Sequence, residues 1–243
     1  MRTLRLDLCY DGTRYRGWQR LPDTENTIQG KLENALSRIL GEPVEISGSG
    51  RTDAGAHALH QIASFSCHST LPPEEIAAQL NRYLPEDIGI HSCREASGRF
   101  HARLNAKRKT YCYRLWVGRE KCVFDRKYVY CFPERLDVEA MRRAAQILVG
   151  EHDFSAFCAR KTKKSTLRRI DEIRIEPVGE ELRLTFTGNG FLYNMVRIIV
   201  GTLLEVGVGK RRPEDLRTLF GASRAEAGFT APAQGLWLME VEY

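Results

Sequence analysis

Residues 4–10 read Leu-Arg-Leu-Asp-Leu-Cys-Tyr, with a large apolar side chain at every second position. A period of two is typical of a β-strand that buries one face. Apolar side chains then recur at helical spacing over 28–39. Asn26 followed by Gln29 predicts a capping box at the start of this helix, and Gly41 is expected to end it. The chain therefore opens with a strand and an amphipathic helix.

The next segments continue this mixed pattern. Short apolar stretches predict strands at about 44–47 and 61–66, Pro73 opens a second helix, and a further strand is expected near 88–93. The resulting order is β-α-β-β-α-β, which is the split βαβ arrangement.

Residues beyond 105 repeat this order without repeating the sequence. The predicted elements are a strand at 109–117, a helix at 138–149, strands at 170–176 and 181–187, helices at 191–206 and 213–220, and a strand at 236–243. We therefore expect an α+β fold with two ferredoxin-like halves, residues 1–105 and 106–243. Each half should have a largely antiparallel sheet, with a cleft between the halves.

The composition is that of a globular protein with an excess of positive charge. Of 243 residues, 42% are hydrophobic and 28% charged, which argues against disorder. The 37 Lys and Arg against 31 Asp and Glu give a net charge of +6. Such a charge favours polyanionic partners such as nucleic acid, although many basic proteins bind none.

Several features predict a cytoplasmic protein with no membrane association. Charged residues within the first ten positions argue against a signal peptide, and the longest apolar run, 195–208, is interrupted by Arg197, Thr202 and Glu205. The seven cysteines include no Cys-x-x-Cys pair, so reduced thiols are expected in place of disulfides or a zinc site.

The most unusual segment is 48–58, which reads GSGRTDAGAHA. One interpretation is a flexible hairpin loop in which Asp53 caps its own backbone. The other is a functional loop, because small residues allow a backbone to approach a ligand closely, and this one also carries Arg51 and His57. The segment is not a P-loop, since no Gly-Lys-Ser/Thr sequence follows.

The stretch GRTDAGAHA at 50–58 resembles the active-site motif of the tRNA pseudouridine synthase A family. Further segments that resemble this family follow its order along the whole chain: YDG at 10–12, GWQ at 17–19, FHAR at 100–103, KTYCY at 109–113, GEHDF at 150–154, FLYNMVR at 191–197 and APAQGL at 231–236. The departures are small: Ala56 stands where the family often has Val, and Trp237 where Tyr is common.

The resemblance implies an isomerase that converts uridine to pseudouridine on the 3′ side of the tRNA anticodon stem-loop, at family positions 38, 39 and 40. It assigns Asp53 as the catalytic carboxylate and Arg197 as its basic partner. It also assigns Tyr111 to stacking on the target base, and Arg51 to holding the nucleotide out of its helix. Asp53 then belongs to the N-terminal half, and Tyr111 and Arg197 to the C-terminal half. The family fold of two ferredoxin-like halves and its homodimeric assembly are implied as well.

This chemistry suits a single carboxylate. The reaction breaks the N1–C1′ bond of uridine, turns the detached uracil, and joins its C5 to C1′. Nothing is oxidised and nothing leaves, so we expect no cofactor and no metal. Asp53 could attack C1′ as a nucleophile or take a proton from C2′ as a base. An arginine nearby would favour the ionised carboxylate.

Each of these side chains also has a structural interpretation. Arg197 could be a surface arginine whose stem lies along an amphipathic helix. Tyr111 and Tyr113 share a strand face, which is ordinarily explained by core packing; we favour base stacking for Tyr111 and packing for Tyr113. His57 and His60 have no evident carboxylate or cysteine partner, so hydrogen bonding is expected in place of metal ligation.

Two basic clusters are candidates for the RNA backbone. Residues 159–169 contain six basic side chains and no acidic one, and a second cluster spans 99–109. Such runs are often only solvated loops, but their position beside the expected cleft favours phosphate contacts. The candidate residues are Arg103, Lys107, Arg108, Lys161, Lys163 and Lys164.

Two other function classes compete with the isomerase. A non-catalytic RNA-binding protein would explain the charge and the fold, but no run resembles the aromatic motifs of RRM sheets. A nuclease usually needs several carboxylates around a metal, and Asp53 has no acidic neighbour in the sequence.

Overall fold

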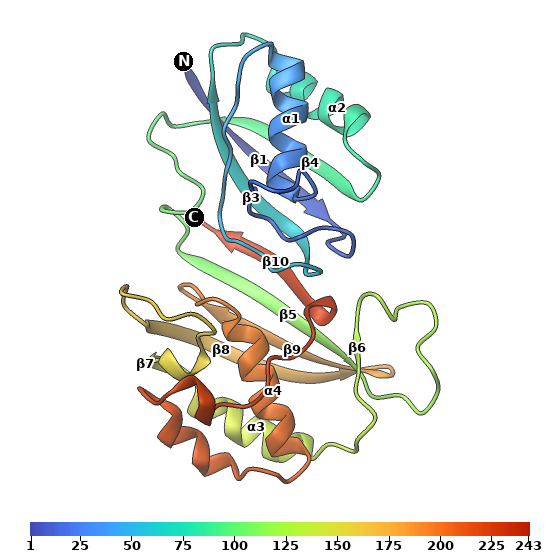
Figure 1. Cartoon of the computed structure of the whole chain (residues 1–243), viewed down its shortest axis with the longest axis vertical. Coiled ribbons are helices and arrows are strands. Elements are labelled where there is room, and N and C mark those ends of the chain that lie inside the picture. The colour runs from blue at the N-terminus through green and yellow to red at the C-terminus, as the bar shows by residue number, and fades with distance from the viewer. The chain divides into compact units, whose positions relative to one another are not determined.

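The computed structural model describes residues 1–243, which form two compact units. The first unit comprises residues 1–107 together with 238–243, and the second comprises 108–237 (Figure 1). The final strand, β10 (Leu236–Glu242), therefore places most of its length in the first unit, whereas the sequence analysis assigned it to the second half.

The first unit is built from three long antiparallel strands and two helices. Its elements are β1 (Arg2–Tyr10), α1 (Ile28–Leu40), β2 (Ser47–Gly48), β3 (His57–Cys67), α2 (Pro73–Tyr83) and β4 (Ile88–Ala96). β1 lies between β3 and β4 and is antiparallel to both, and β2 pairs with the far side of β3. The leucines at 4, 6 and 8 are fully buried, as the alternation predicts. They share the core with apolar side chains of α1 and α2, which pack against each other (Figure 1).

Two local predictions in this unit are wrong. The N-cap of α1 is Thr27, whose side chain accepts a hydrogen bond from Gly30 N at 3.1 Å, and not Asn26. The Asn26 side-chain amide instead donates to the carbonyl oxygen of Arg14 at 2.6 Å, so it stabilises the preceding loop. The strand expected at 44–47 is reduced to the two residues of β2, whereas β3 begins at His57, four residues earlier than expected.

The second unit also combines antiparallel strands with helices. Its elements are β5 (Arg108–Trp116), β6 (Tyr130–Cys131), α3 (Val138–Ile147), β7 (Gly150–Asp153), β8 (Leu167–Val178), β9 (Glu181–Gly188) and α4 (Met195–Gly207). Four short 3₁₀ helices complete the unit: η1 (Ser155–Phe157), η2 (Pro213–Leu219), η3 (Arg224–Glu226) and η4 (Ala233–Gly235). The antiparallel strand order is β5-β9-β8-β7, and β6 adds a short parallel pairing to β5.

The helix expected from residue 191 begins at Met195, because Asn194 has the left-handed φ of 62°. Residues 213–219 form a 3₁₀ segment, where the sequence predicted an α-helix. The short strands β6 and β7 were not predicted. The chain is thus a mixed α/β protein with mostly antiparallel pairing, and none of its helices has the length and hydropathy to span a bilayer.

Candidate active site

The loop that carries Asp53 joins β2 to β3 in the first unit. Asp53 is half-buried, Thr52 before it is buried, and Arg51 is exposed. The loop enters from Ser49, whose N–H donates to the carbonyl oxygen of Ile62 on β3 at 2.7 Å. On the far side of Asp53, Ala56 N–H donates to the Asp53 carbonyl oxygen at 3.1 Å, which closes a turn. Asp53 therefore lies between two anchored backbone segments.

A buried set of polar side chains holds the first part of this loop. The Tyr10 hydroxyl lies 2.7 Å from Thr52 Oγ1. Gln61 Nε2 donates to the Gly50 carbonyl oxygen at 2.9 Å, and the Ser49 hydroxyl donates to Gln61 Oε1 at 2.5 Å. Burial raises the pKa of Tyr10 above its ordinary value, and hydrogen bonds with Thr52 and Gln61 partly oppose this shift. These bonds connect the residues preceding Asp53 to β1 and β3.

Two glycines allow residues 12–18 to lie directly against the loop. Gly17 has a φ of +92°, and a Cβ there would lie 2.8 Å from the Thr52 carbonyl oxygen. A Cβ at Gly12 would lie 1.9 Å from the Ala56 carbonyl oxygen. Trp18 N–H donates to the Thr52 carbonyl oxygen at 3.1 Å. The loop is therefore held in place, which argues against the interpretation as a flexible hairpin connection.

His57 is a buried member of the same structure. Its Nδ1 lies 3.1 Å from the backbone nitrogen of Gly12 and 3.1 Å from an Asp11 carboxylate oxygen. The ring accepts from Gly12 only in the tautomer that carries its proton on Nε2. The expectation of hydrogen bonding at His57 is confirmed.

Tyr111 and Tyr113 lie on β5 of the second unit. Tyr113 is fully buried, and its hydroxyl donates to the Pro232 carbonyl oxygen at 2.7 Å, so the packing role expected for it is confirmed. Tyr111 is 7% exposed and meets Phe191 edge-on, with ring centroids 5.2 Å apart and an interplanar angle of 85°. Phe191 thus fixes the plane of the Tyr111 ring.

Arg197 extends from the first turn of α4 and is half-buried. Its Nε donates to the Ala231 carbonyl oxygen at 2.7 Å, and Ala231 N–H donates to the Arg197 carbonyl oxygen at 3.1 Å. Burial raises the pKa of Tyr113, and the positive charge of Arg197 partly opposes this shift. Arg197 is therefore anchored beside a buried tyrosine, which does not fit a solvent-extended surface arginine.

The candidate RNA-binding residues differ in how freely they face solvent. Arg103 and Lys107 in the first unit are exposed, as are the three lysines at 161, 163 and 164 in the second. Arg108 forms an ion pair with Asp171, with Nε and the carboxylate oxygen 3.1 Å apart. The Arg108 side chain remains 45% exposed in this pair.

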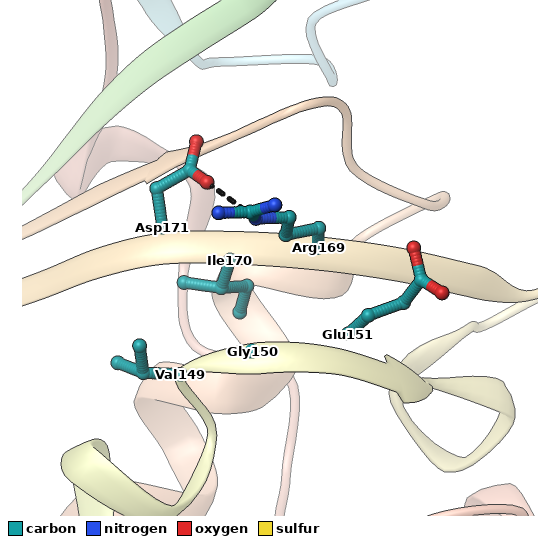
Figure 2. Close-up of a pocket in the computed structure, with 6 residues that line it drawn as sticks. All are labelled: Val149, Gly150, Glu151, Arg169, Ile170 and Asp171. Carbon is teal, nitrogen blue, oxygen red and sulfur yellow. Dashed lines mark ion pairs between the residues drawn. The ribbon is translucent and has the colours of Figure 1, made fainter.

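A shallow pocket of about 330 Å³ lies between β7 and β8 (Figure 2). Residues 149–151 line one side and residues 169–171 the other. An ion pair of 2.9 Å joins Arg169 Nε to Asp171 across its upper edge. None of the predicted catalytic or substrate-binding residues lines this pocket.

One cluster of potential metal ligands was not predicted from the sequence. Asp7 lies 3.1 Å from His60 Nδ1, and His91 completes a cluster with them on three neighbouring strands. The expectation that His57 and His60 have no carboxylate partner is wrong for both, since Asp11 lies beside His57 and Asp7 beside His60. Strand alternation alone could not have found the cluster, because it depends on the register between β1, β3 and β4.

Comparison with known proteins defines the family. The family model described as tRNA pseudouridine synthase matches residues 9–104 and 144–243. The tRNA pseudouridine synthase A of Bacillus sp. (strain KSM-64) is 46% identical over 245 residues and that of Brevibacillus brevis is also 46% identical, each aligning over 100% of both chains. The enzyme of the same name from Caldicellulosiruptor bescii is 43% identical, again over 100% of both chains. The chain belongs to the tRNA pseudouridine synthase family, whose members are isomerases.

Proposed function

We propose that this protein isomerises uridine to pseudouridine on the 3′ side of the tRNA anticodon stem-loop, at positions 38, 39 and 40, with Asp53 as the catalytic carboxylate. The observation that carries the proposal is the anchoring of Asp53 in a glycine-lined loop. This loop belongs to a chain that aligns from end to end with enzymes named tRNA pseudouridine synthase A.

The proposed division of labour uses side chains of both units. Asp53 attacks C1′ of the target nucleotide or removes the C2′ proton, and Arg197 supplies the positive charge that keeps this carboxylate ionised. Tyr111 offers an aromatic face to the uracil, and its ring plane is already fixed by Phe191. Arg51, exposed two residues before Asp53, holds the extruded nucleotide out of its stack.

Further proposals concern the fold of each unit, the assembly of the protein and its contacts with RNA. We infer that each unit is a variant of the ferredoxin-like split βαβ fold, supported by the β-α-β-β-α-β order of residues 2–96. We also propose a cleft between the halves, a homodimer as the active assembly, and the cytoplasm, where tRNA is modified, as the location. The exposed side chains of Lys161, Lys163, Lys164, Arg103, Lys107 and Arg108 are assigned to phosphate contacts.

One assay tests the reaction against its two rivals. Purified protein is incubated with an unmodified tRNA that carries uridine at positions 38, 39 and 40, in parallel in EDTA with monovalent salt and in Mg²⁺, the ion that a metal-dependent nuclease could use. We expect pseudouridine at these positions and intact RNA. Cleaved RNA would identify a nuclease, and bound but unchanged RNA would identify a binding protein.

Position specificity is tested with matched transcripts. Three tRNAs each retain uridine at only one of the three positions, with the stem repaired by compensating bases, and a fourth retains none of them. Product in the first three and none in the fourth supports the proposal. Product in the fourth tRNA would place the target elsewhere.

A further inference from the structure

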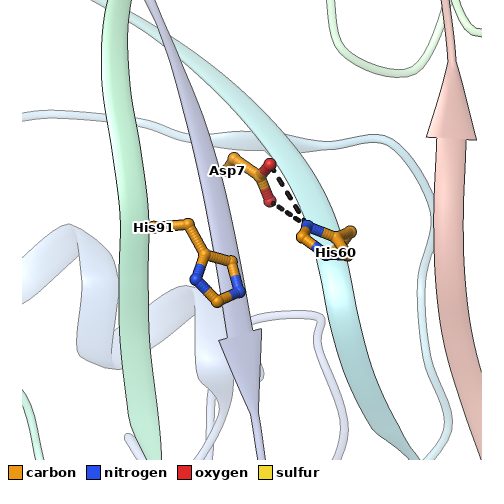
Figure 3. A group of neighbouring side chains, drawn as sticks. All are labelled: Asp7, His60 and His91. Atoms are coloured by element: carbon orange, nitrogen blue, oxygen red, sulfur yellow. Dashed lines mark hydrogen bonds and ion pairs between the residues drawn. The ribbon is translucent and has the colours of Figure 1, made fainter.

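The face of the first unit's sheet formed by neighbouring parts of β1, β3 and β4 carries a group of side chains that the proposed reaction does not use. Asp7 on β1, His60 on β3 and His91 on β4 each offer one ligand atom, and these three atoms all lie within 4.8 Å of one another (Figure 3). We propose that Asp7, His60 and His91 form a binding site for one first-row divalent transition-metal ion of the Zn²⁺ or Co²⁺ type.

A backbone irregularity brings His91 to the face of Asp7. Between β1 and β4 the pairing passes from Asp7–Ser92 to Leu8–Ile90, so His91 is an extra residue in a β-bulge. Side chains in a regular ladder alternate between faces, and His91 would then point away from the face of Ser92 and Asp7. A bulge redirects the side chain at the inserted residue, which explains how His91 reaches this cluster.

A second bulge lies beside His60. The pairing between β1 and β3 passes from Leu8–Gln61 to Tyr10–Ala58, so Leu59 and His60 together oppose one residue of β1. Bulges disrupt the hydrogen-bond ladder and are frequent where a strand must orient a functional side chain. Ile62 pairs with Asp7, so alternation along β3 already places His60 on the Asp7 face, and this bulge only adjusts the direction of its side chain.

The distances are close to those of a metal site. His60 Nδ1 lies 3.1 and 3.3 Å from the two Asp7 carboxylate oxygens. Zinc–ligand bonds of about 2.0–2.2 Å in a tetrahedron place neighbouring ligand atoms about 3.4 Å apart. The most distant pair here lies no more than 4.8 Å apart, and a rotation of an exposed histidine closes this gap.

The two histidines are also positioned relative to each other. Their ring centroids lie 4.9 Å apart at an interplanar angle of 35°. His91 Nε2 lies 3.0 Å from the carbonyl oxygen of Leu59, the residue before His60. A backbone carbonyl that orients a histidine ring is the usual partner of a histidine ligand, although here the ion must use the other nitrogen or displace this bond.

The donor set selects the class of ion. Two imidazoles and one carboxylate suit Zn²⁺, Co²⁺, Ni²⁺ or Cu²⁺, whereas Mg²⁺ and Ca²⁺ prefer oxygen ligands. Cys9 on the same strand is a free, half-buried thiol, so a Cys9→Ser variant tests whether sulfur takes part in binding.

Solvent access leaves room for further ligands. The side chains of His60 and Asp7 are 51% and 27% exposed, so water can complete the coordination sphere. The ion would join three neighbouring strands and stabilise the first unit against unfolding, because it binds the folded chain only. It has no step in the reaction proposed at Asp53.

The test is titration of the full-length, EDTA-stripped protein with Co²⁺ and Zn²⁺ in the absence of RNA. Calorimetry and the visible absorption of bound Co²⁺ are measured, and melting temperatures are recorded with and without metal. We expect one ion per chain, no sulfur-to-cobalt charge-transfer band, a higher melting temperature, and no response to Mg²⁺.

Variants then assign the site. His60→Ala and His91→Ala should each weaken binding by at least the 10–100-fold typical of losing a supporting residue around a metal. The metal-free melting temperatures should stay unchanged, since both side chains are exposed. His68→Ala is the matched control, because His68 pairs with Glu42 at 2.9 Å as an exposed histidine–carboxylate pair outside this cluster.

Cysteines supply the second control. Cys122 and Cys131 lie close together, so a Cys122→Ser, Cys131→Ser double variant and a Cys9→Ser variant should both bind as the unmodified protein does. Binding that persists in His60→Ala and His91→Ala, or that is lost in His68→Ala or either cysteine variant, would overturn the assignment. Absence of saturable binding below about 1 mM would do the same.

Discussion

At the scale of single residues, the position of Asp53 depends on glycines that let residues 12–18 lie against its loop. Gly17→Ala should lower the rate of pseudouridine formation about 10²-fold, because its Cβ would displace Thr52 and hence Asp53 by a fraction of an ångström or more. Gly41→Ala is the matched control: Gly41 also has a positive φ, +70°, but no atom lies within 4 Å of the position that a Cβ would take. Backbone strain should cost each variant roughly 1–2 kcal/mol of stability, and the clash with the Thr52 carbonyl oxygen should add to this cost in Gly17→Ala.

Steady-state rates and urea unfolding curves, measured on both glycine variants, separate the two effects. Equal rate losses in the two variants would show that activity follows stability alone, and that close packing of residue 17 against the loop has no catalytic importance.

Arg197 provides a second prediction at this scale. Arg197→Met should reduce the single-turnover rate much more than it reduces tRNA affinity, and Arg197→Lys should recover part of the rate by restoring the charge without the planar fork. Single-turnover kinetics at saturating enzyme, together with filter-binding affinities, provide the comparison. A lysine variant no faster than the methionine variant would assign to Arg197 a structural role, such as its hydrogen bond to the Ala231 carbonyl oxygen.

Single residues also show how far the sequence could be interpreted. The motif around Asp53 locates the loop, and the fixed position of that loop agrees with a functional interpretation. The Asp7, His60 and His91 cluster could not be predicted, because the register between the three strands and the bulge at His91 are set by strand pairing and leave no pattern in any one strand. Local sequence identifies a site within one loop more readily than a site spread over three strands.

At the scale of elements, the pairing of β5 with β9 contains a buried charged group. Glu181, at the start of β9, accepts hydrogen bonds from Arg114 Nε at 3.0 Å and from Arg183 Nε at 2.9 Å. Burial alone would raise the pKa of Glu181, but the hydrogen bonds from both arginines hold it below its usual 4.5. The contribution to stability is therefore present above pH 4.5 and is lost as the pH falls through the lower pKa of the folded state.

Glu181→Gln should accordingly destabilise the protein by about 1.5–3 kcal/mol at pH 7, the range for hydrogen bonds to a charged group. The difference in melting temperature from the unmodified protein should shrink as the pH is lowered below 4.5. Glu172→Gln is the control, because its ion pair with Arg174 is half-exposed and should contribute less than about 1 kcal/mol. Thermal melts across this pH range test the prediction, and a difference that grows in acid would contradict it.

The sequence predicted which helices and long strands form better than it predicted the residues at which they begin and end. Periodicity located the principal helices and long strands, since each buries one face. The caps depended on competition for particular hydrogen bonds: Asn26 bonds to Arg14, which leaves Thr27 to cap α1. The left-handed Asn194 delays α4 to Met195, and nothing in the sequence FLYNMVR requires that conformation.

At the scale of the whole molecule, the net charge of +6 is expected to act through particular lysines. Replacing Lys161, Lys163 and Lys164 by alanine should weaken tRNA binding and reduce the slope of log affinity against log salt by up to about 3, because each phosphate contact releases counterions. The reaction rate of bound RNA should change little. Binding is measured by filter retention over a range of salt concentrations.

The control for this prediction removes the same charge elsewhere in the second unit, at the exposed residues Lys121, Lys127 and Lys210. Its slope should stay close to that of the unmodified protein. Similar slopes for both triple variants would mean that residues 161–164 form only a solvated loop.

The central claim is that Asp53 performs the chemistry, and pseudouridine formation by Asp53→Asn tests it most directly. An amide keeps the size of the side chain but can neither attack C1′ nor accept a proton. Asp23→Asn, at an exposed aspartate paired with Arg16, is the matched control. We predict no detectable product from Asp53→Asn, nearly unchanged tRNA affinity, and full activity from Asp23→Asn. Turnover by Asp53→Asn, in protein shown by mass spectrometry to be free of deamidation, would contradict the account.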